Sequence, residues 1–173
     1  MARFVNKVAS SVRTAMRNPL IREKEATIWN QDLMEVSCGQ ISMAVVKGND
    51  SLEDMSRVED DRIHATFIGV YDGYGRDVAS KFVARMLIQN LRDLIQEHGG
   101  MSQELLTQVF ANAENNMRSI VVNSYPFEPA FAVSGTCCLV GVIWGDVLFL
   151  AHVGNSRAVM GLRSPQGRSI IPA

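Results

Sequence analysis

The stretch Ala65–Gly75, with the sequence ATFIGVYDGYG, decides how the chain folds and where its chemistry lies. Its first seven residues are rich in apolar, β-branched and aromatic side chains, which predicts a buried strand. Asp72 follows at the exit of this strand, where rigid backbone would hold its carboxylate. The neighbouring glycines would let an ion or a phosphate approach the chain closely. An ordinary Asp-Gly turn is the alternative interpretation.

Outward from this strand, the chain shows a pattern typical of an α+β fold. The predicted elements are strands over 39–47 and 65–71, helices over 77–97 and 102–121, and strands over 136–144, 147–153 and 157–161. The helices are predicted because apolar residues recur at intervals of three and four, and Ser102 can cap the second one. Gly145-Asp146 predicts a tight hairpin turn. Consecutive hairpins imply antiparallel strands, and the two helices can cover one face of them.

Two segments are predicted to lack regular structure. Residues 51–62 are polar and acidic, which indicates a loop, and residues 164–173 indicate a short polar tail. Glu53 and Asp54 form an acidic pair in that loop. Divalent cations such as Mg²⁺ prefer oxygen ligands of this kind, although solvated surface charge is the alternative.

The composition is that of a folded domain. The chain has 173 residues, of which 47% are hydrophobic, and a formal net charge of −1. This combination excludes intrinsic disorder as the main state and gives no reason to expect a nucleic-acid partner. The three cysteines are interpreted as packing thiols of a reducing compartment, with Cys137 and Cys138 on opposite faces of a strand. His64, His98 and His152 lack ligand spacing and are predicted to be packed or solvent-facing.

The N-terminus is basic and amphipathic. Residues 1–22 contain five basic side chains and no acidic one, and residues 3–17 place their apolar side chains on one helical face. Three interpretations stay open: an organelle transit peptide, a membrane-surface contact through 1–17, and a solvated extension. We expect an intracellular protein, with the cytoplasm favoured, because no secretory signal is recognisable.

Several ordered motifs point to one family. They are SMAVV at 42–46, LED at 52–54, GVYDG at 69–73, SGTCCLVGVI at 134–143 and LAHVGNSRAV at 150–159. In this order and spacing the chain resembles the type 2C metal-dependent protein serine/threonine phosphatases, especially plant members. The resemblance covers about residues 28–161.

The resemblance implies a fold and a chemistry. The family's fold is a sandwich of two antiparallel sheets flanked by helices, which agrees with the predicted element order. Its reaction is the hydrolysis of phosphoserine or phosphothreonine with two Mg²⁺ or Mn²⁺ ions, which are bridged by the aspartate at the position of Asp72. The carbonyl of Gly73 and the acid at Glu53, with Asp54 beside it, support one of these ions.

Three positions depart from the family's pattern. Tyr74 stands where the family has the histidine expected to donate a proton to the leaving alcohol, and a phenol with a reference pKa of about 10 is a poor general acid at neutral pH. Asn49 lies where many members carry a phosphate-binding arginine. Asn155 stands in a Gly-Asn-Ser-Arg sequence where Gly-Asp-Ser-Arg is expected, so that an acidic group is replaced by an amide.

The length also differs from the family's pattern. Measured against it, the chain stops a little past the middle of the catalytic domain, before two further aspartates and several elements. We therefore expect a partial, C-terminally truncated sandwich. Its predicted divisions are a basic extension and linker at 1–27, a truncated phosphatase-like domain at 28–163 and the tail at 164–173. Metal binding by Asp72, Gly73 and Glu53 is expected to be weak or absent.

These departures predict a pseudophosphatase, which binds phosphoproteins or regulatory proteins without turnover. The alternative is a weak Mg²⁺- or Mn²⁺-dependent protein phosphatase. A further alternative is the product of a truncated gene without a role of its own. Uncovered strand edges would also favour self-association or pairing with a related phosphatase.

Overall fold

The computed structural model describes residues 28–46, 52–164 and 167–172. The elements in chain order are β1 (Ile28–Val36), β2 (Gly39–Val46), β3 (Met55–Asp60), β4 (Ala65–Tyr74), α2 (Val78–His98), α3 (Gln103–Ser124), the 3₁₀ helix η2 (Pro129–Val133), β5 (Gly135–Trp144), β6 (Val147–Val153), β7 (Val159–Ser164) and β8 (Gly167–Pro172). The predicted α+β class is therefore confirmed.

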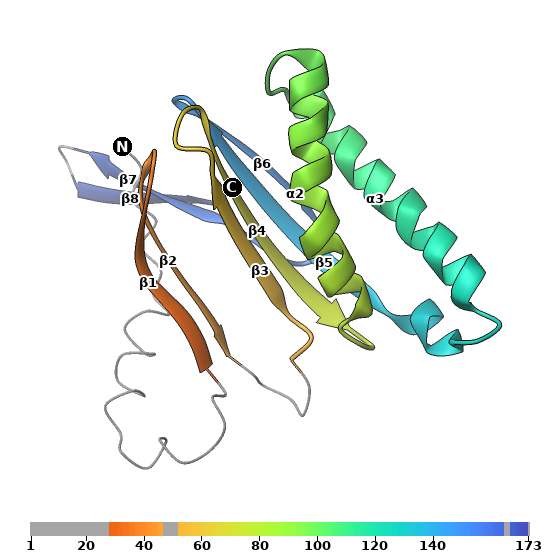
Figure 1. The fold of residues 1–173 in the computed structure, drawn as a ribbon. Helices are drawn as coiled ribbons and strands as arrows, with labels where there is room; N and C mark the ends of the chain where they lie inside the picture. Colours follow the sequence, from red (N-terminus) through yellow and green to blue (C-terminus); the bar gives the residue numbers. More distant parts are fainter. Residues whose placement is uncertain (1–27, 47–51, 165–166, 173) are drawn as a thin grey trace, which may run out of the picture.

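The centre of the fold is a four-stranded antiparallel sheet with the strand order β3-β4-β5-β6. Helices α2 and α3 cover one face of this sheet, as predicted (Figure 1). Two further antiparallel pairs, β1-β2 and β7-β8, are separate sheets. The β1-β2 pair lies on the other side of the central sheet from the helices (Figure 1). The structure is thus a partial form of a layered α+β sandwich.

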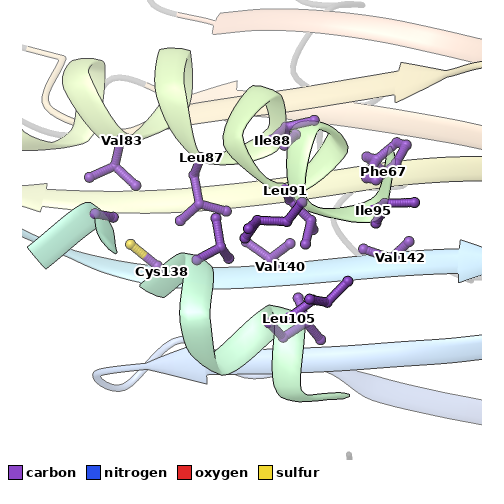
Figure 2. Packing of buried hydrophobic residues seen from close by; sticks show 14 of the residues in the cluster. Phe67, Val83, Leu87, Ile88, Leu91, Ile95, Leu105, Cys138, Val140 and Val142 are labelled. Carbon is purple, nitrogen blue, oxygen red and sulfur yellow. The ribbon is translucent and has the colours of Figure 1, made fainter. Parts of the chain in front are cut away.

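The core lies between the central sheet and the two helices. Figure 2 shows its middle, where side chains of α2 and α3 meet those of β4 and β5. The residues that are fully buried there include Tyr71, Leu87, Ile88, Leu91, Val109, Val140 and Val142. They come from every second position of the strands and from one face of each helix, which is the pattern that two packed layers require.

The ends of α2 follow from its sequence. Asp77 occupies its N-cap, and Gly99 ends it in the left-handed region with φ 75°. That conformation is open to glycine at little steric cost, so Gly99 stops the helix as predicted. The hairpin between β5 and β6 is also confirmed, because Trp144 pairs with Val147 across the Gly145-Asp146 turn.

The acidic segment 51–62, predicted as a loop, contains the edge strand β3, so that prediction was wrong. Arg57 and Glu59 both contact α2. The Arg57 guanidinium donates to the carbonyl oxygen of Ala84 at 3.0 Å and forms an ion pair with Glu59. Arg92 of α2 contacts Glu59 at 3.1 Å. Because its inward side chains are charged, the strand lacks the apolar alternation by which a strand is predicted. The groups that stabilise these charges lie far along the chain.

Both ends of the described chain also differ from expectation. Strand β1 was not predicted; it begins at Ile28, the first residue of the predicted phosphatase-like domain, and its pairing with β2 shifts between Gln31 and Met34. This bulge breaks the alternation by which a strand is recognised. The residues predicted as a polar tail contain β8, which pairs with β7 from Val159↔Pro172 to Ser164↔Gly167.

The β1-β2 turn is fastened to the central sheet by hydrogen bonds. The Ser37 hydroxyl donates to Asp60 Oδ1 at 2.7 Å, and the Thr66 hydroxyl donates to the same oxygen at 2.6 Å. Thr66 is fully buried and lies on the helix-free side of β4. The turn therefore covers one end of the helix-free face, and the other end of β4, which carries Asp72, is more open.

The basic N-terminal segments 1–17, 1–22 and 1–27 lie outside the described residues. Within the part of the chain that the structure describes, none of the helices has the length and apolar character needed to cross a membrane.

Candidate functional site

Strand β4 presents Asp72 to solvent on the helix-free face of the central sheet. Side chains alternate along the strand, so Tyr71 is buried against the helices and Asp72 is exposed. Gly73 is buried, and Tyr74 is exposed again. The predicted position of Asp72, at the exit of a buried strand, is therefore where the structure places it.

Asp54 joins Asp72 at this place. Its side chain hydrogen-bonds that of Asp72, and it also accepts the backbone N–H of Gly73. Partial withdrawal from water, followed by the negative charge of Asp72, raises the pKa of Asp54 above its ordinary value. The loop acid and the strand acid, which lie 18 positions apart in the sequence, form one carboxylate pair.

Glu53 lies beside Gly73 through its main chain. The Ser80 hydroxyl, fully buried in the first turn of α2, donates to the Glu53 carbonyl oxygen and also to the Asp77 carbonyl oxygen at 3.2 Å. A Cβ on Gly73 would overlap the Glu53 carbonyl and come within 2.8 Å of the Ser80 hydroxyl. Glycine is therefore required at position 73 for this close approach. The contact fixes the segment that carries Asp54 against the end of β4.

Cys137 lies directly across from Asp72 in the ladder of β4 and β5. Paired residues share a face, so Cys137 lies on the open side with Asp72, while its neighbour Cys138 is buried in the core. This confirms the opposite orientations predicted for the two thiols.

Asn155 reaches the same group through Cys137. The Cys137 thiol donates a hydrogen bond to Asn155 Oδ1 with a separation of 3.3 Å. Gly154 makes this approach possible, because its φ is +93° and a Cβ there would come within 2.8 Å of the Cys137 Cβ. The sequence interpretation treated Cys137 only as a packing thiol. The one signal for its role was the alternation that separates it from Cys138.

Tyr74 belongs to the same face, but its side chain lies over β5. It pairs with Gly135 of β5, and its ring covers that glycine, since a Cβ on Gly135 would overlap the phenol. The side chain is 58% exposed. The structure thus brings together Asp54, Asp72, Cys137 and Asn155, with Tyr74 at their border. Asn49 lies outside the described residues.

The three histidines contribute nothing to this group. The ring of His64 stacks on that of Trp144 with centroids 6.0 Å apart, and His98 Nδ1 lies 2.9 Å from the Leu94 carbonyl oxygen. His152 is exposed and pairs with Leu139 across β6 and β5. All three are packed or solvent-facing, as predicted.

Residues 35–169 match the family model described as protein phosphatase 2C. The chain belongs to this family. The resemblance inferred from the ordered motifs is therefore confirmed, and protein phosphatase 2C is a family of metal-dependent serine/threonine phosphatases that use Mg²⁺ or Mn²⁺.

The most similar relatives include plant proteins. The chain is 44% identical over 134 residues to "Probable protein phosphatase 2C 43" from Oryza sativa subsp. japonica, covering 78% of this chain and 34% of that protein. It is 38% identical over 146 residues to "Probable protein phosphatase 2C 46" from Arabidopsis thaliana, covering 80% and 38%. The chain therefore spans little more than a third of the length of these protein phosphatase 2C relatives.

Solved structures support the fold. The serine-threonine phosphatase 2C from Toxoplasma gondii superposes with a TM-score of 0.54 at 20% identity, covering 72% of this chain and 45% of that one. A C. elegans sex determining protein superposes with a TM-score of 0.53 at 15% identity, covering 90% and 38%. At these identities the likeness concerns the fold alone, which is a partial protein phosphatase 2C fold.

The family's two metal ions provide a test of the site. Mg²⁺ and Mn²⁺ need several oxygen ligands each. Among the residues that the structure describes, no group of three or more His, Cys, Asp or Glu side chains is arranged to hold a metal ion. The described carboxylates here are Asp54 and Asp72, which hydrogen-bond to each other, and Glu53, whose charge also acts on Asp54. This donor set does not fit two resident ions.

Proposed function

We propose that this chain is a catalytically inactive protein phosphatase 2C, a pseudophosphatase that binds phosphoproteins or regulatory proteins on the helix-free face around Asp72. The observation that carries the proposal is the donor set at the end of β4. Asp54 and Asp72 engage each other, and the third polar group of the site, Asn155, is an uncharged amide that accepts from Cys137.

Tyr74 supports the same proposal. It occupies the position where the family's pattern has a histidine, and its ring lies over Gly135. A phenol has a reference pKa of about 10, far above the neutral range in which a proton donor to the leaving alcohol works best. A side chain held over a neighbouring glycine is also less free to reach a substrate oxygen.

A binding role is supported by the open surface beside the carboxylates. Val70 is 42% exposed on the same face of β4, two positions before Asp72. Together with Tyr74 it places apolar and aromatic surface beside the acidic pair. Such mixed surface is typical of protein-binding sites, where aromatic side chains contribute contact area and a polar end.

The test is a phosphatase assay on purified protein with Mn²⁺ and phosphoserine or phosphothreonine peptides. We expect no turnover above that of Asp72→Asn, with Asp146→Asn as a control in the exposed β5-β6 turn. Turnover that Asp72→Asn abolishes and Asp146→Asn leaves unchanged would refute the proposal. The binding role is tested separately by pull-down of the same phosphopeptides with Val70→Asp, which should lose binding.

A weak Mg²⁺- or Mn²⁺-dependent phosphatase is the second candidate. It is favoured by the closeness of Asp54 and Asp72. Partial withdrawal from water, and then the negative charge of Asp72, raises the pKa of Asp54, and a bound cation would offset that charge. Binding of Mn²⁺ that lowers the pKa of Asp54 and is accompanied by peptide hydrolysis would support this candidate over the pseudophosphatase.

Association with a second copy or with a related phosphatase also belongs to the proposed function. In the described central sheet, β3 and β6 each have one edge without a paired strand. Open edges offer backbone donors and acceptors to another chain. Strand β3 carries the salt-bridged side chains Arg57 and Glu59, and charged side chains disfavour pairing at an edge strand. We therefore expect β6 to be the edge that pairs. A monomer that persists at high concentration in size-exclusion chromatography would contradict this expectation.

A further inference from the structure

Asn155 stands in a loop after β6, between Gly154 and Ser156, and it is exposed. An asparagine followed by a small residue is chemically labile where the backbone can rearrange, because the next backbone nitrogen can reach the side-chain carbonyl. We propose that Asn155 is a deamidation site, at which the amide converts spontaneously to a carboxylate beside Cys137 and Asp72. This inference goes beyond the proposed function and does not depend on it.

The reaction balances with water alone. The backbone nitrogen of Ser156 attacks Cγ of Asn155, so that an N–Cγ bond forms and the Cγ–Nδ2 bond breaks. The side-chain nitrogen takes up the proton lost from the backbone amide and leaves as ammonia. Water then opens the cyclic imide at one of its two carbonyls, which gives either aspartate or isoaspartate at position 155. No electron is gained or lost by the protein.

The backbone around Asn155 is open to this rearrangement. Residues 154–158 belong to no helix or strand. Among the described residues, no hydrogen bond to the Ser156 amide is present, so the attacking nitrogen is not held by a carbonyl group. Gly154 precedes the site with φ +93°, a left-handed conformation that glycine adopts at little steric cost.

Cys137 favours the attack on the side-chain carbonyl. Its thiol donates to Asn155 Oδ1 at 3.3 Å, the same oxygen that gains negative charge when the nitrogen adds to Cγ. A thiol is a weak hydrogen-bond donor, but a donor already placed on the developing oxyanion stabilises it without reorganisation. The contact also holds the side chain in one orientation over the sheet.

The chain contains its own control for this chemistry. Asn123-Ser124 is the same dipeptide, and Asn123 is exposed as well, but both residues lie in α3. They are the last two residues of the helix, and its hydrogen bonding extends to the C-cap, where the Tyr125 amide donates to the Val121 carbonyl oxygen at 2.8 Å. Helical hydrogen bonding holds the backbone nitrogen of Ser124, so that it cannot readily reach the side-chain carbonyl of Asn123. The deamidation rates of Asn155 and Asn123 should therefore differ in the folded protein and be similar in the unfolded chain.

The consequence is a new charge at a position where the family's pattern has an acid. Cys137 pairs with Asp72 across the sheet and contacts the side chain of residue 155. A carboxylate at position 155 would therefore be separated from the acidic pair by Cys137 alone. Deamidation would thus change the charge of the site with time, without any enzyme or cofactor.

The experiment follows the intact, purified chain in mildly alkaline buffer by mass spectrometry. A protease that cleaves before Asp146 separates Asn155 from Asn123, so each site is measured in its own peptide. We expect Asn155 to convert at least about tenfold faster than Asn123, which corresponds to about 1.4 kcal/mol in activation free energy. In denaturant the two rates should converge. Equal rates in the folded protein, or an intact Asn155, would overturn the proposal.

Two variants test the parts of the mechanism. Ser156→Val places a branched side chain on the attacking residue and should slow conversion at Asn155 while leaving Asn123 unchanged. Cys137→Ala should also slow it, and an unchanged rate in this variant would overturn the role given to the thiol. If either variant fails to fold, the ratio of the two asparagines in the unmodified chain still decides whether the site exists.

Discussion

The ring of Tyr74 lies over Gly135, its direct partner across β4 and β5. Glycine weakens a strand because it offers no side chain to pack, and an aromatic cross-strand neighbour can cover the gap. The position that departs from the family's histidine therefore has a structural role. The phenol lies across the sheet over Gly135 of β5, and Asp72 lies two residues earlier on the same face.

This pairing predicts a coupling between the two positions. Gly135→Ala should destabilise the protein by about 1 to 3 kcal/mol, because a Cβ at this position would overlap the Tyr74 ring. In a Tyr74→Ala background the same change should cost almost nothing, since the ring is gone. Urea unfolding of the four proteins measures the coupling free energy. Gly161→Ala is the matched control, because a Cβ there meets nothing within 4 Å.

Asp54 predicts a pH dependence. Its pKa is raised in the folded state by burial and by Asp72, so it favours folding most when it is protonated. Its contribution is therefore present at acidic pH and is lost as the pH rises through its folded pKa. Asp54→Asn should stabilise the protein at neutral pH by a few tenths of a kcal/mol, a small effect because solvent screens the charge. Below the ordinary pKa of an aspartate side chain the substitution should have no such effect. Denaturant titrations at both pH values test this, and equal shifts would contradict it.

Asp60 predicts the opposite dependence. Partial burial raises its pKa, but the hydrogen bonds from Thr66 and Ser37 together outweigh burial and lower it. Its stabilising contribution is therefore present above the unfolded pKa and is lost as the pH falls through the folded one. Asp60→Asn should cost roughly 1 kcal/mol at neutral pH and much less in acid. Stability curves measured beside Asp146→Asn check the effect, and a loss that persists unchanged in acid would rule out this account.

The two neighbouring thiols predict a difference in reactivity. Burial, and then the charge of Cys137, raises the pKa of Cys138 to about 11, so little thiolate forms at neutral pH. Cys137 is half-buried on the open face. Alkylation of the folded protein should therefore label Cys137 and spare Cys138, which should react only after unfolding. Peptide mapping with and without denaturant measures this, and labelling of Cys138 in the folded state would show that the core is open.

Much of the fold was predictable because its signals are local. Apolar residues at helical spacing predicted α2 and α3, Gly99 marked the end of α2, and Gly145-Asp146 predicted the β5-β6 hairpin. Strand β3 was not predictable. Its inward residues are charged, and they are stabilised by α2 groups such as the Ala84 carbonyl, which lies 27 positions from Arg57.

The candidate site was predictable only in part. Asp72, Gly73 and Tyr74 are neighbours on one strand, so their arrangement follows from strand geometry. The approach of Asn155 to Cys137 depends on the register in which β5 pairs with β6 and on the turn at Gly154, and no local pattern encodes this combination. The role of Cys137 therefore emerged only when the chain was folded.

Titration of the protein with Mn²⁺ by isothermal calorimetry tests the central claim most directly. With Asp54 and Asp72 as the described carboxylate pair, we expect no site tighter than roughly 1 mM, which corresponds to about 4 kcal/mol of binding free energy. Asn155→Asp should strengthen binding, because it adds a carboxylate beside Cys137. Two tight Mn²⁺ sites per chain, both lost in Asp72→Asn, would contradict the account.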